Sequence, residues 1–328
     1  FDLYCDCEGK AMALRQRALI SSNVWTVQLP DEEGVQTRLN EMETVSLVLC
    51  RCIENNKVED RDDLCPEFGL SLHIEINGSK ILFDMGSSAA FADNAEALGI
   101  DLADVGVAVV SHHHFDHGGG LERFFELNDR ALVYLRQGPL VDRYFKAFGV
   151  IKRPIGLDLD LLGRFPRRIE YVDDMRVVAP GVYLLTGIGS THQRPRGNRR
   201  LFVDSDSGLV PDPFDHELMM VVHDDDGMVV FTGCSHHGIL NLIDAARAQF
   251  PRVPIKAVFG GFHLIGLPFV NSMAASSSEV RNIGFQVMEK VDGTVYSGHC
   301  TGEMAFGVLA GVMGEKLEAF HTGATVEV

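Results

Sequence analysis

The chain has 328 residues, of which 46% are hydrophobic and 23% charged, and this composition is that of a globular protein with a large core. Its formal net charge of −17 repels nucleic-acid phosphates and anionic lipid, so we expect neither nucleic acid nor a membrane as a partner. No apolar run of about 18 residues is present to span a bilayer, and no basic start followed by an apolar run indicates a leader, so we expect a cytoplasmic protein. The seven scattered cysteines indicate reduced thiols, and the sequence leaves the oligomeric state open.

The first part of the chain differs in pattern from the rest. Residues 1–43 are polar and poorly patterned, and we interpret them as an N-terminal extension of unknown role. From Thr44 the pattern changes, and residues 44–328 are expected to form one catalytic domain. Its first predicted element is a buried strand over 45–50, followed by an acidic loop over 54–63.

Strands and helices alternate along the predicted domain. Apolar alternation on both sides of the Asn77-Gly78 turn predicts a β-hairpin that ends in Asp84. The predicted elements of the first half are hairpin strands over 70–76 and 80–84, a helix over 89–98 and a buried strand over 105–110. Those of the second half are strands over 182–186, 218–223, 228–232, 255–259 and 294–297, and helices over 239–249 and 278–290.

A run of metal-type side chains over 112–117 (His-His-His-Phe-Asp-His) follows the strand that ends at residue 110. Imidazole and carboxylate together suit zinc, iron or manganese. His112 and His114 are two residues apart and can hold one ion, while Asp116 and His117 lie where the chain turns and can face a second. Two adjacent ions would share a water molecule whose pKa falls to about 7. We therefore expect two divalent ions, zinc first, with manganese or iron as alternatives.

Each ion needs further ligands, and the later strand ends supply candidates. His236, His263 and His299 each follow a predicted strand, so they are expected to converge on the edge where ligands bind in α/β sheets. We rank His236 and His299 first because each is flanked by glycine or a small residue. His263 is interpreted equally as a ligand or as a residue that contacts substrate. Cys234 is interpreted equally as a thiolate ligand or as a buried, metal-free cysteine.

The run over 112–117 resembles the signature of the metallo-β-lactamase superfamily, and residues 81–86 (Ile-Leu-Phe-Asp-Met-Gly) resemble its upstream aspartate motif. The resemblance implies an αβ/βα sandwich, with two mixed sheets flanked by helices and the metals at one edge. It also implies that Asp84 supports the metal loop without binding metal, and that Cys234 stands where many members have a bridging aspartate. On this basis Asp116, His236 and Asp84 are expected to be catalytic residues.

A narrower resemblance is to the branch named for the dihydropterin-ribofuranosylaminobenzene-phosphate synthase, over about 44–328. The segments that carry it are Gly69-Leu70-Ser71, Gly233-Cys234-Ser235-His236, Gly238-Ile239-Leu240-Asn241, Gly260-Gly261-Phe262-His263-Leu264 and Gly298-His299-Cys300-Thr301-Gly302. Three residues depart from the branch: Phe68 replaces a frequent histidine, and His113 and His237 replace small residues. Because these positions are expected near the pocket, substrate identity does not transfer.

The remaining polar residues are less informative. Neither a Gly-x-Ser-x-Gly elbow nor a phosphate loop is present, so the mechanism is expected to use metal ions. The isolated histidines at 73, 192, 216 and 321 are interpreted as structural, with Asp215 and His216 as weak ligand alternatives. The basic patch of Arg194, Arg196, Arg199 and Arg200 could clamp an anion, but we favour a solvated loop.

The sequence thus predicts a metal-dependent hydrolase that acts on a small anionic, phosphorylated substrate. One alternative is a synthase-like condensation on a phosphoribosyl or pterin substrate, as the narrower resemblance implies. Another is a non-catalytic sensor that keeps its metal site for ligand binding. Redox chemistry at two iron ions is a further alternative, which visible absorbance of an iron-bound protein would indicate.

Overall fold

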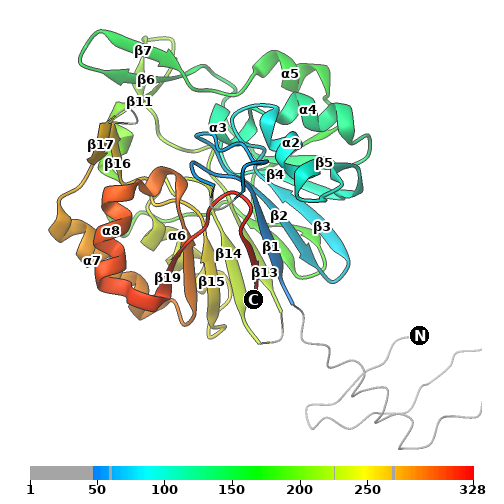
Figure 1. The fold of residues 1–328 in the computed structure, drawn as a ribbon. Helices are drawn as coiled ribbons and strands as arrows, with labels where there is room; N and C mark the ends of the chain where they lie inside the picture. Colours follow the sequence, from blue (N-terminus) through cyan, green and yellow to red (C-terminus); the bar gives the residue numbers. More distant parts are fainter. Residues whose placement is uncertain (1–46, 59–60, 225, 268–269) are drawn as a thin grey trace, which may run out of the picture. The chain divides into compact units, whose positions relative to one another are not determined.

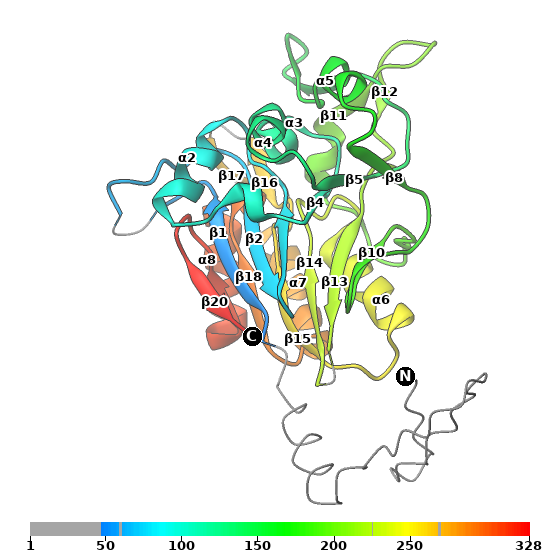
Figure 2. The same cartoon turned by 90° about the vertical axis from the view of Figure 1, so that its right-hand side faces the viewer.

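A computed structural model describes residues 47–58, 61–224, 226–267 and 270–328. Two seven-stranded mixed sheets lie face to face, and helices cover their outer faces (Figures 1 and 2). The first sheet has the strand order β20-β1-β2-β3-β4-β5-β8 and the second β19-β18-β15-β14-β13-β10-β9. This arrangement is the predicted αβ/βα sandwich.

The strands of the first sheet are β1 (Leu49–Glu54), β2 (Ser71–Ile76), β3 (Ser79–Phe83), β4 (Val107–Val110), β5 (Leu132–Arg136), β8 (Ile169–Val172) and β20 (Thr325–Glu327). Those of the second are β9 (Arg176–Ala179), β10 (Val182–Leu185), β13 (Met219–His223), β14 (Met228–Phe231), β15 (Ile255–Phe259), β18 (Thr294–Ser297) and β19 (Leu317–Ala319). Strands β3, β4, β5 and β8 run parallel, as do β14, β15, β18 and β19, so each sheet has a block of strands whose carboxyl ends meet at one edge.

Two smaller sheets and the helices complete the described chain. A four-stranded sheet contains β6 (Arg143–Ala147), β7 (Ile151–Pro154), β11 (Leu201–Val203) and β12 (Val210–Pro211), and a hairpin contains β16 (Ile265–Leu267) and β17 (Val270–Met273). The α-helices are α2 (Ala90–Ala97), α3 (Phe115–Gly118), α4 (Leu121–Leu127), α5 (Leu159–Arg164), α6 (Ile239–Gln249), α7 (Ser277–Lys290) and α8 (Glu303–Met313). The 3-10 helices are η1 (Leu102–Asp104), η2 (Arg196–Arg200), η3 (His299–Thr301) and η4 (Gly314–Lys316).

The core has three layers of apolar side chains. The middle layer lies between the sheets, where residues such as Ile74 and Phe231 are fully buried. Helices α2 and α4 cover the first sheet, and α6, α7 and α8 cover the second. Because both faces of the sheets are covered, central strands such as β14 are buried at every position and form continuous apolar runs. Helix α7 begins at a capping box formed by Ser276 and Glu279, which satisfies the backbone at its start.

The strand predicted over 45–50 overlaps β1 (Leu49–Glu54) only at its end; residues 47 and 48 are not in a strand, and residues 45–46 lie outside the described residues. The register of β1 pairs Cys50 with Ile74 and Cys52 with Leu72, which buries both thiols and carries the strand into the segment predicted as an acidic loop. The predicted extension over 1–43 lies outside the described residues. Within the described ranges, the structure contains no helix with the length and apolar character needed to cross a bilayer.

Candidate metal centre

The predicted ligands lie at the edge where the parallel blocks of both sheets end. Residues 112–117 follow β4 and continue into α3, which is drawn at the top of the sandwich in Figure 1. Cys234 and His236 follow β14, His263 follows β15, and His299 begins η3 after β18. The tertiary fold therefore brings residues nearly 190 positions apart in sequence to one place, as expected for ligands at the carboxyl ends of strands.

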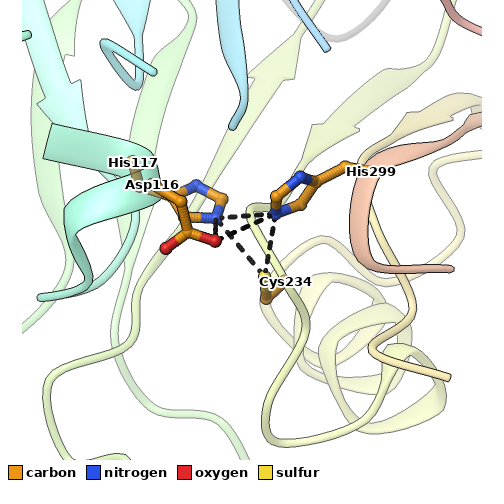
Figure 3. Close-up of side chains that lie close together, drawn as sticks. All are labelled: Asp116, His117, Cys234 and His299. Carbon is orange, nitrogen blue, oxygen red and sulfur yellow. Dashed lines mark hydrogen bonds and ion pairs between the residues drawn. The ribbon is translucent and has the colours of Figure 1, made fainter. Parts of the chain in front are cut away.

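One set of donors, which we call the Asp116 group, consists of Asp116, His117, Cys234 and His299. Their side chains point toward a common centre from α3, η3 and the loop after β14 (Figure 3). Nε2 of His117 lies 3.2 Å from Nε2 of His299, and both lie 3.3 Å from Sγ of Cys234. An Oδ2 atom of Asp116 lies 3.4 Å from Nε2 of His299. All four side chains are buried.

The second set, the His112 group, consists of His112, His114 and His236. Nε2 of His112 lies 3.2 Å from Nε2 of His236, and the ring centroids of His112 and His114 are 4.6 Å apart. The two groups are neighbours, because the rings of His112 and His117 are only 4.2 Å apart. The structure thus places the donors predicted for the first ion in one group and those predicted for the second in the other.

The spacing of the donor atoms tests whether a metal fits. In a tetrahedral zinc site, two nitrogen ligands at about 2.0–2.1 Å are separated by about 3.3 Å, and a thiolate at about 2.3 Å lies about 3.6 Å from each nitrogen. The 3.2 Å between His117 and His299 is close to the first value, and the 3.3 Å from each of them to Cys234 is about 0.3 Å shorter than the second. The His112 group offers three nitrogen donors. Three protein ligands are enough for a catalytic zinc site, in which the fourth position is left open for water or substrate. Both groups therefore fit a divalent ion.

The hydrogen bonds on the far side of the imidazoles support the same conclusion. Nδ1 of His117 lies 2.6 Å from Oδ2 of Asp84, and Nδ1 of His299 lies 3.2 Å from Oδ1 of Asn56. Because carboxylate and amide oxygens only accept, each Nδ1 carries a proton, and in the neutral ring each Nε2 presents a lone pair. Two such Nε2 atoms 3.2 Å apart repel each other unless a proton or a metal ion lies between them. Such outer partners also orient metal-bound histidines.

The His112 group has outer partners of the same kind. Nδ1 of His236 lies 3.0 Å from Oδ1 of Asn198, and Nδ1 of His112 lies 2.9 Å from Oγ of Ser111. Nε2 of His114 has no hydrogen-bond partner among the described residues, and its nearest carboxylate is Asp212 at 4.0 Å. Because the Ser111 hydroxyl donates to Asp84, it accepts from Nδ1 of His112, so the Nε2 atoms of neutral His112 and His236 present lone pairs to each other.

Asp84 lies outside both groups and holds the metal loop in place. It is fully buried, and its carboxylate accepts from the Ser111 backbone N–H at 2.7 Å, the Ser111 hydroxyl at 2.8 Å and His117 Nδ1 at 2.6 Å. Its φ of 61° is in the left-handed region, as are those of Ser235, His263 and His299. Strained backbone of this kind gathers at functional sites. The position of Asp84 agrees with a supporting role and not with a ligand.

His263 occupies an intermediate position. One of its ring nitrogens lies within 4.8 Å of the donor atoms of Cys234 and His236, and its ring centroid is 4.3 Å from that of His236. It is half-buried and lines the cavity above the centre. The geometry places it next to both groups without making it part of either, which leaves both predicted roles open.

Charge in the centre follows from burial and from neighbouring groups. Burial lowers the pKa of His112 and His236 well below the usual value, and the surrounding imidazoles lower it further. Burial also opposes charge on His117, but Asp84 and Asp116 outweigh it and raise its pKa to about 9. For Asp116, burial raises the pKa, but His117 and His299 reverse this and hold it below the usual range. The His112 group is therefore neutral at pH 7, as metal binding by imidazole requires.

Glu54, at the end of β1, is a buried carboxyl group that sequence reasoning placed in a loop. It is 0% exposed, and its Oε1 accepts from the Ser87 backbone N–H at 2.8 Å. Oε2 has no hydrogen-bond partner among the described residues. Burial raises the pKa of Glu54 to about 7, although the Ser87 hydrogen bond opposes this shift. The carboxyl group thus loses a proton near neutral pH.

We expect Glu54→Gln to change how stability depends on pH. Because the folded-state pKa is raised from 4.5 to about 7, the stabilising contribution of Glu54 is complete below pH 4.5 and is lost as the pH rises through 7. Between about pH 4 and pH 8 the variant should gain about 3 kcal/mol in unfolding free energy relative to the original chain. Urea unfolding at both pH values measures this, with exposed Glu96→Gln as the control. An equal difference at both pH values would contradict the assignment.

Several residues around the centre were missed by sequence reasoning. Asp212 is buried and lies 3.2 Å from Nε2 of His216 and 3.5 Å from Nε of Arg143. Glu217 accepts from the backbone N–H groups of His236 and His237 and thereby fixes the loop after β14. His216, interpreted as structural, also accepts from the His113 backbone at 3.0 Å. No local pattern marks Asp212 or Glu217 as part of the site, because Arg143 and the His236 backbone, which they contact, are remote in sequence.

The three departures from the synthase-like branch have different locations. Phe68 lines the cavity, and its ring lies 4.8 Å from that of His299. His113 lies outside both groups and outside the cavity lining, with Nε2 3.1 Å from the carbonyl of Arg136. His237 is held by Glu217 at 2.6 Å. Only Phe68 therefore changes the surface that a substrate would meet.

A cavity of about 530 Å³ opens onto both groups, and we call it the metal cavity. The donors His114, Asp116, Cys234 and His236 form its floor, and its walls are largely apolar. The apolar and aromatic wall residues are Phe68, Phe115, Phe145, Pro154, Ile155, Leu201 and Ile265. Phe115 is 40% exposed, so a ligand can reach it from solvent. The small sheet that contains β6, β7 and β11 contributes much of this wall.

The protein is a sandwich of two mixed sheets, and two adjacent groups of side chains that can bind metal lie at one edge of it. These features are those of a metal-binding protein with an αβ/βα sandwich fold. The family model described as the metallo-beta-lactamase superfamily matches residues 66–255, and the chain belongs to this superfamily. A solved structure titled Tm1679, a metal-dependent hydrolase of the beta-lactamase superfamily, is similar with a TM-score of 0.70 and 28% identity, over 86% of this chain and 99% of that chain.

Two further relatives show how far the likeness extends. The 7,8-dihydropterin-6-methyl-4-(beta-D-ribofuranosyl)-aminobenzene-5'-phosphate synthase of Methanocaldococcus jannaschii is 25% identical over 278 residues, which cover 80% of this chain and 90% of that protein. The metallo-beta-lactamase fold protein YhfI from Bacillus subtilis has a TM-score of 0.51 at 13% identity, over 87% of this chain and 100% of that chain, and shares the fold alone. The narrower resemblance to the synthase-like branch is thus confirmed.

Proposed function

We propose that this protein is a metal-dependent hydrolase that acts on a small anionic substrate. The observation that carries the proposal is the pair of adjacent buried donor groups at the floor of the metal cavity. His112, His114 and His236 would hold one divalent ion, and Asp116, His117, Cys234 and His299 would hold the other. Bound there, the ions would supply an activated water molecule and neutralise charge on the substrate.

The protein groups around the donors determine what the chain itself contributes. Asp84, Asn56 and Asn198 fix the imidazole tautomers, so the donor atoms are oriented before any ion binds. The apolar cavity walls exclude water and strengthen electrostatic interactions inside. The imidazole ring of His263 lies beside that of His236 and lines the cavity, where it can contact a bound substrate.

The metal type follows from the donors. The imidazole and thiolate ligands of the Asp116 group favour zinc, and the carboxylate of Asp116 is compatible with manganese or iron. Cys234 contributes to the Asp116 group and lies within 4.8 Å of the donor atoms of His236 and His263. Because a thiolate replaces the aspartate expected to bridge, we expect the two positions to differ in affinity.

The assay that tests the proposal uses protein purified without added metal. Plasma mass spectrometry should find about two equivalents of divalent metal, with zinc predominant. The protein should hydrolyse bis-p-nitrophenyl phosphate, and removal of metal by a chelator should abolish the activity until zinc or manganese is restored. Lactones and β-lactams serve as alternative substrates. Inactivity toward all three classes with the metal sites filled would overturn simple hydrolysis.

The second candidate is a synthase-like condensation, which the match to the Methanocaldococcus jannaschii synthase over 90% of that protein favours. It predicts that pyrophosphate is released when a phosphoribosyl substrate and a pterin partner are both present, one of them carrying the diphosphate that leaves as the new bond forms, and that none is released with water alone. The enzyme assay that distinguishes the two therefore compares pyrophosphate release with and without the pterin. Phe68, which replaces the frequent histidine of that branch, lies at the cavity wall where such a partner would bind.

A further inference from the structure

A second cavity of about 530 Å³ lies next to the metal cavity and has a different chemical character. We call it the basic cavity. It lies between η2, the β6–β7 turn and the β16–β17 hairpin. Among the described residues, the lining contains no carboxylate and has four cationic side chains, which are those of Lys146, Arg196, Arg199 and Arg200. The chain as a whole has a net charge of −17, so this cavity is much more positive than the average of the protein.

Most of this positive charge is not neutralised by side chains of the residues that the structure describes. Arg196 forms an ion pair with Glu279. Within the described parts of the chain, no carboxylate lies within ion-pair distance of Lys146, Arg199 or Arg200. Nζ of Lys146 lies 4.8 Å from the centre of the Phe202 ring, which positions the ammonium group at the cavity wall. Cations that converge without a protein counter-charge are typical of anion-binding sites.

The η2 segment was predicted to be a solvated loop; Arg196 and Arg199 are indeed exposed, but the segment is a helix and not a loop. Residues Arg196–Arg200 form a 3-10 helix, and Gly197 within it is buried. A Cβ atom at Gly197 would lie 2.9 Å from the ring of His263, so η2 packs directly against the metal centre. The arginines thus project from a segment whose position is fixed by its contact with the site.

The two cavities share part of their walls. Gly197 and Gly266 line both, and neither has a side chain that could separate them. Adjacent positions on the small sheet also divide between the cavities: Phe145 lines the metal cavity and Lys146 the basic cavity. The alternation of side chains along a strand explains this division. One ligand could therefore reach from the metal centre into the basic cavity.

We propose that the basic cavity binds the phosphate monoester of a small substrate whose reacting bond lies in the metal cavity. The position of the reacting bond in the metal cavity rests on the proposed function, whereas binding of the phosphate in the basic cavity does not. A phosphate monoester carries close to two negative charges and matches the fork of a guanidinium group, as Arg199 and Arg200 could provide. This phosphate is recognised but does not react, so the metal centre cleaves a different bond.

Binding of inorganic phosphate tests the site without catalysis. In the protein with its metals, phosphate should shift the side-chain Nε–Hε NMR signals of Arg199 and Arg200 in a saturable manner. The double variant Arg199→Ala, Arg200→Ala should bind phosphate at least tenfold more weakly at this site, as measured by calorimetry. Arg167→Ala removes one positive charge from an exposed loop outside the cavity lining and should leave binding unchanged. His114→Ala should also keep the basic-cavity binding, which separates it from phosphate held by metal.

A kinetic comparison connects the cavity to substrate recognition. For a hydrolysed substrate with and without a distal phosphate, the phosphate should lower KM by at least tenfold in the original chain. The double variant should lose that difference while kcat changes less than twofold, because the reacting bond lies elsewhere. Phosphate binding that is unaffected by the double variant would overturn the inference. Phosphate binding without any hydrolysis would overturn the proposed function and leave the anion site established.

Discussion

Replacing His114 with alanine is expected to lower the metal content from about two equivalents to about one and to reduce hydrolysis by more than about 100-fold. The reason is that the His112 group has only three donors, and two imidazoles do not hold a catalytic ion. Loss of an outer partner already costs about 10–100-fold in affinity or activity, so loss of a direct donor should cost more. Metal analysis and the phosphodiester assay measure the two effects.

The control for His114→Ala is His192→Ala. His192 is half-buried and pairs with Asp244 at 2.9 Å, away from both donor groups. The His192→Ala variant should therefore keep the full metal content and activity. Absorbance of the cobalt-substituted protein provides a second measurement, in which the spectrum of the Asp116 group should persist in His114→Ala because Cys234 remains. Full activity with two ions in His114→Ala would contradict the assignment. A biological output that survives loss of metal would favour the sensor alternative.

Replacing Asp84 with alanine is expected to destabilise the protein by about 3–5 kcal/mol and to weaken metal binding by about 10–100-fold. The carboxylate accepts three hydrogen bonds in a fully buried position, and alanine would leave the Ser111 and His117 donors without an acceptor. The φ of 61° at this position adds strain, because alanine adopts the left-handed region less readily than aspartate does. Urea unfolding and zinc titration measure the two quantities.

A second substitution separates backbone strain from hydrogen bonding at Asp84. Asparagine tolerates the left-handed backbone and keeps one acceptor oxygen, so Asp84→Asn should lose less stability than Asp84→Ala. It should still weaken metal binding, because the negative charge beside His117 is removed. Asp62→Ala, at an exposed position, should change stability by less than about 0.5 kcal/mol. If Asp84→Ala unfolded at the same urea concentration as the original chain, the supporting role would be wrong.

The secondary structure near the site could be predicted from local patterns. The hairpin around Asn77-Gly78, the helix over 239–249 and the strands at 255–259 and 294–297 agree with the structure to within about two residues. These segments have strong periodicity because each is buried on defined faces. The small sheet with β6, β7, β11 and β12 was not predicted, because its short strands have no continuous apolar pattern and the β6–β11 pairing that joins its two hairpins connects residues nearly 60 positions apart.

Individual ligands could be proposed from their residue type and from the strand each one follows. The sequence could not show which ligands share one metal ion. Whether Cys234 belongs with His117 and His299 depends on the relative position of two sheets, and no local pattern encodes a separation of 3.3 Å. The same holds for Asn56 and Asn198, which are ordinary polar residues in the sequence and become functional only through contact with His299 and His236.

The sequence alone determined the fold class and the presence of a metal-type cluster, because the run over 112–117 places four donors within six residues next to a buried strand. The tertiary structure decided how the donors divide into two groups, and it turned a basic segment interpreted as a solvated loop into one wall of a cavity. The physical reason is distance along the chain. Local sequence sets backbone conformation, whereas contacts between remote strand ends form only when both sheets pack and bury the core between them.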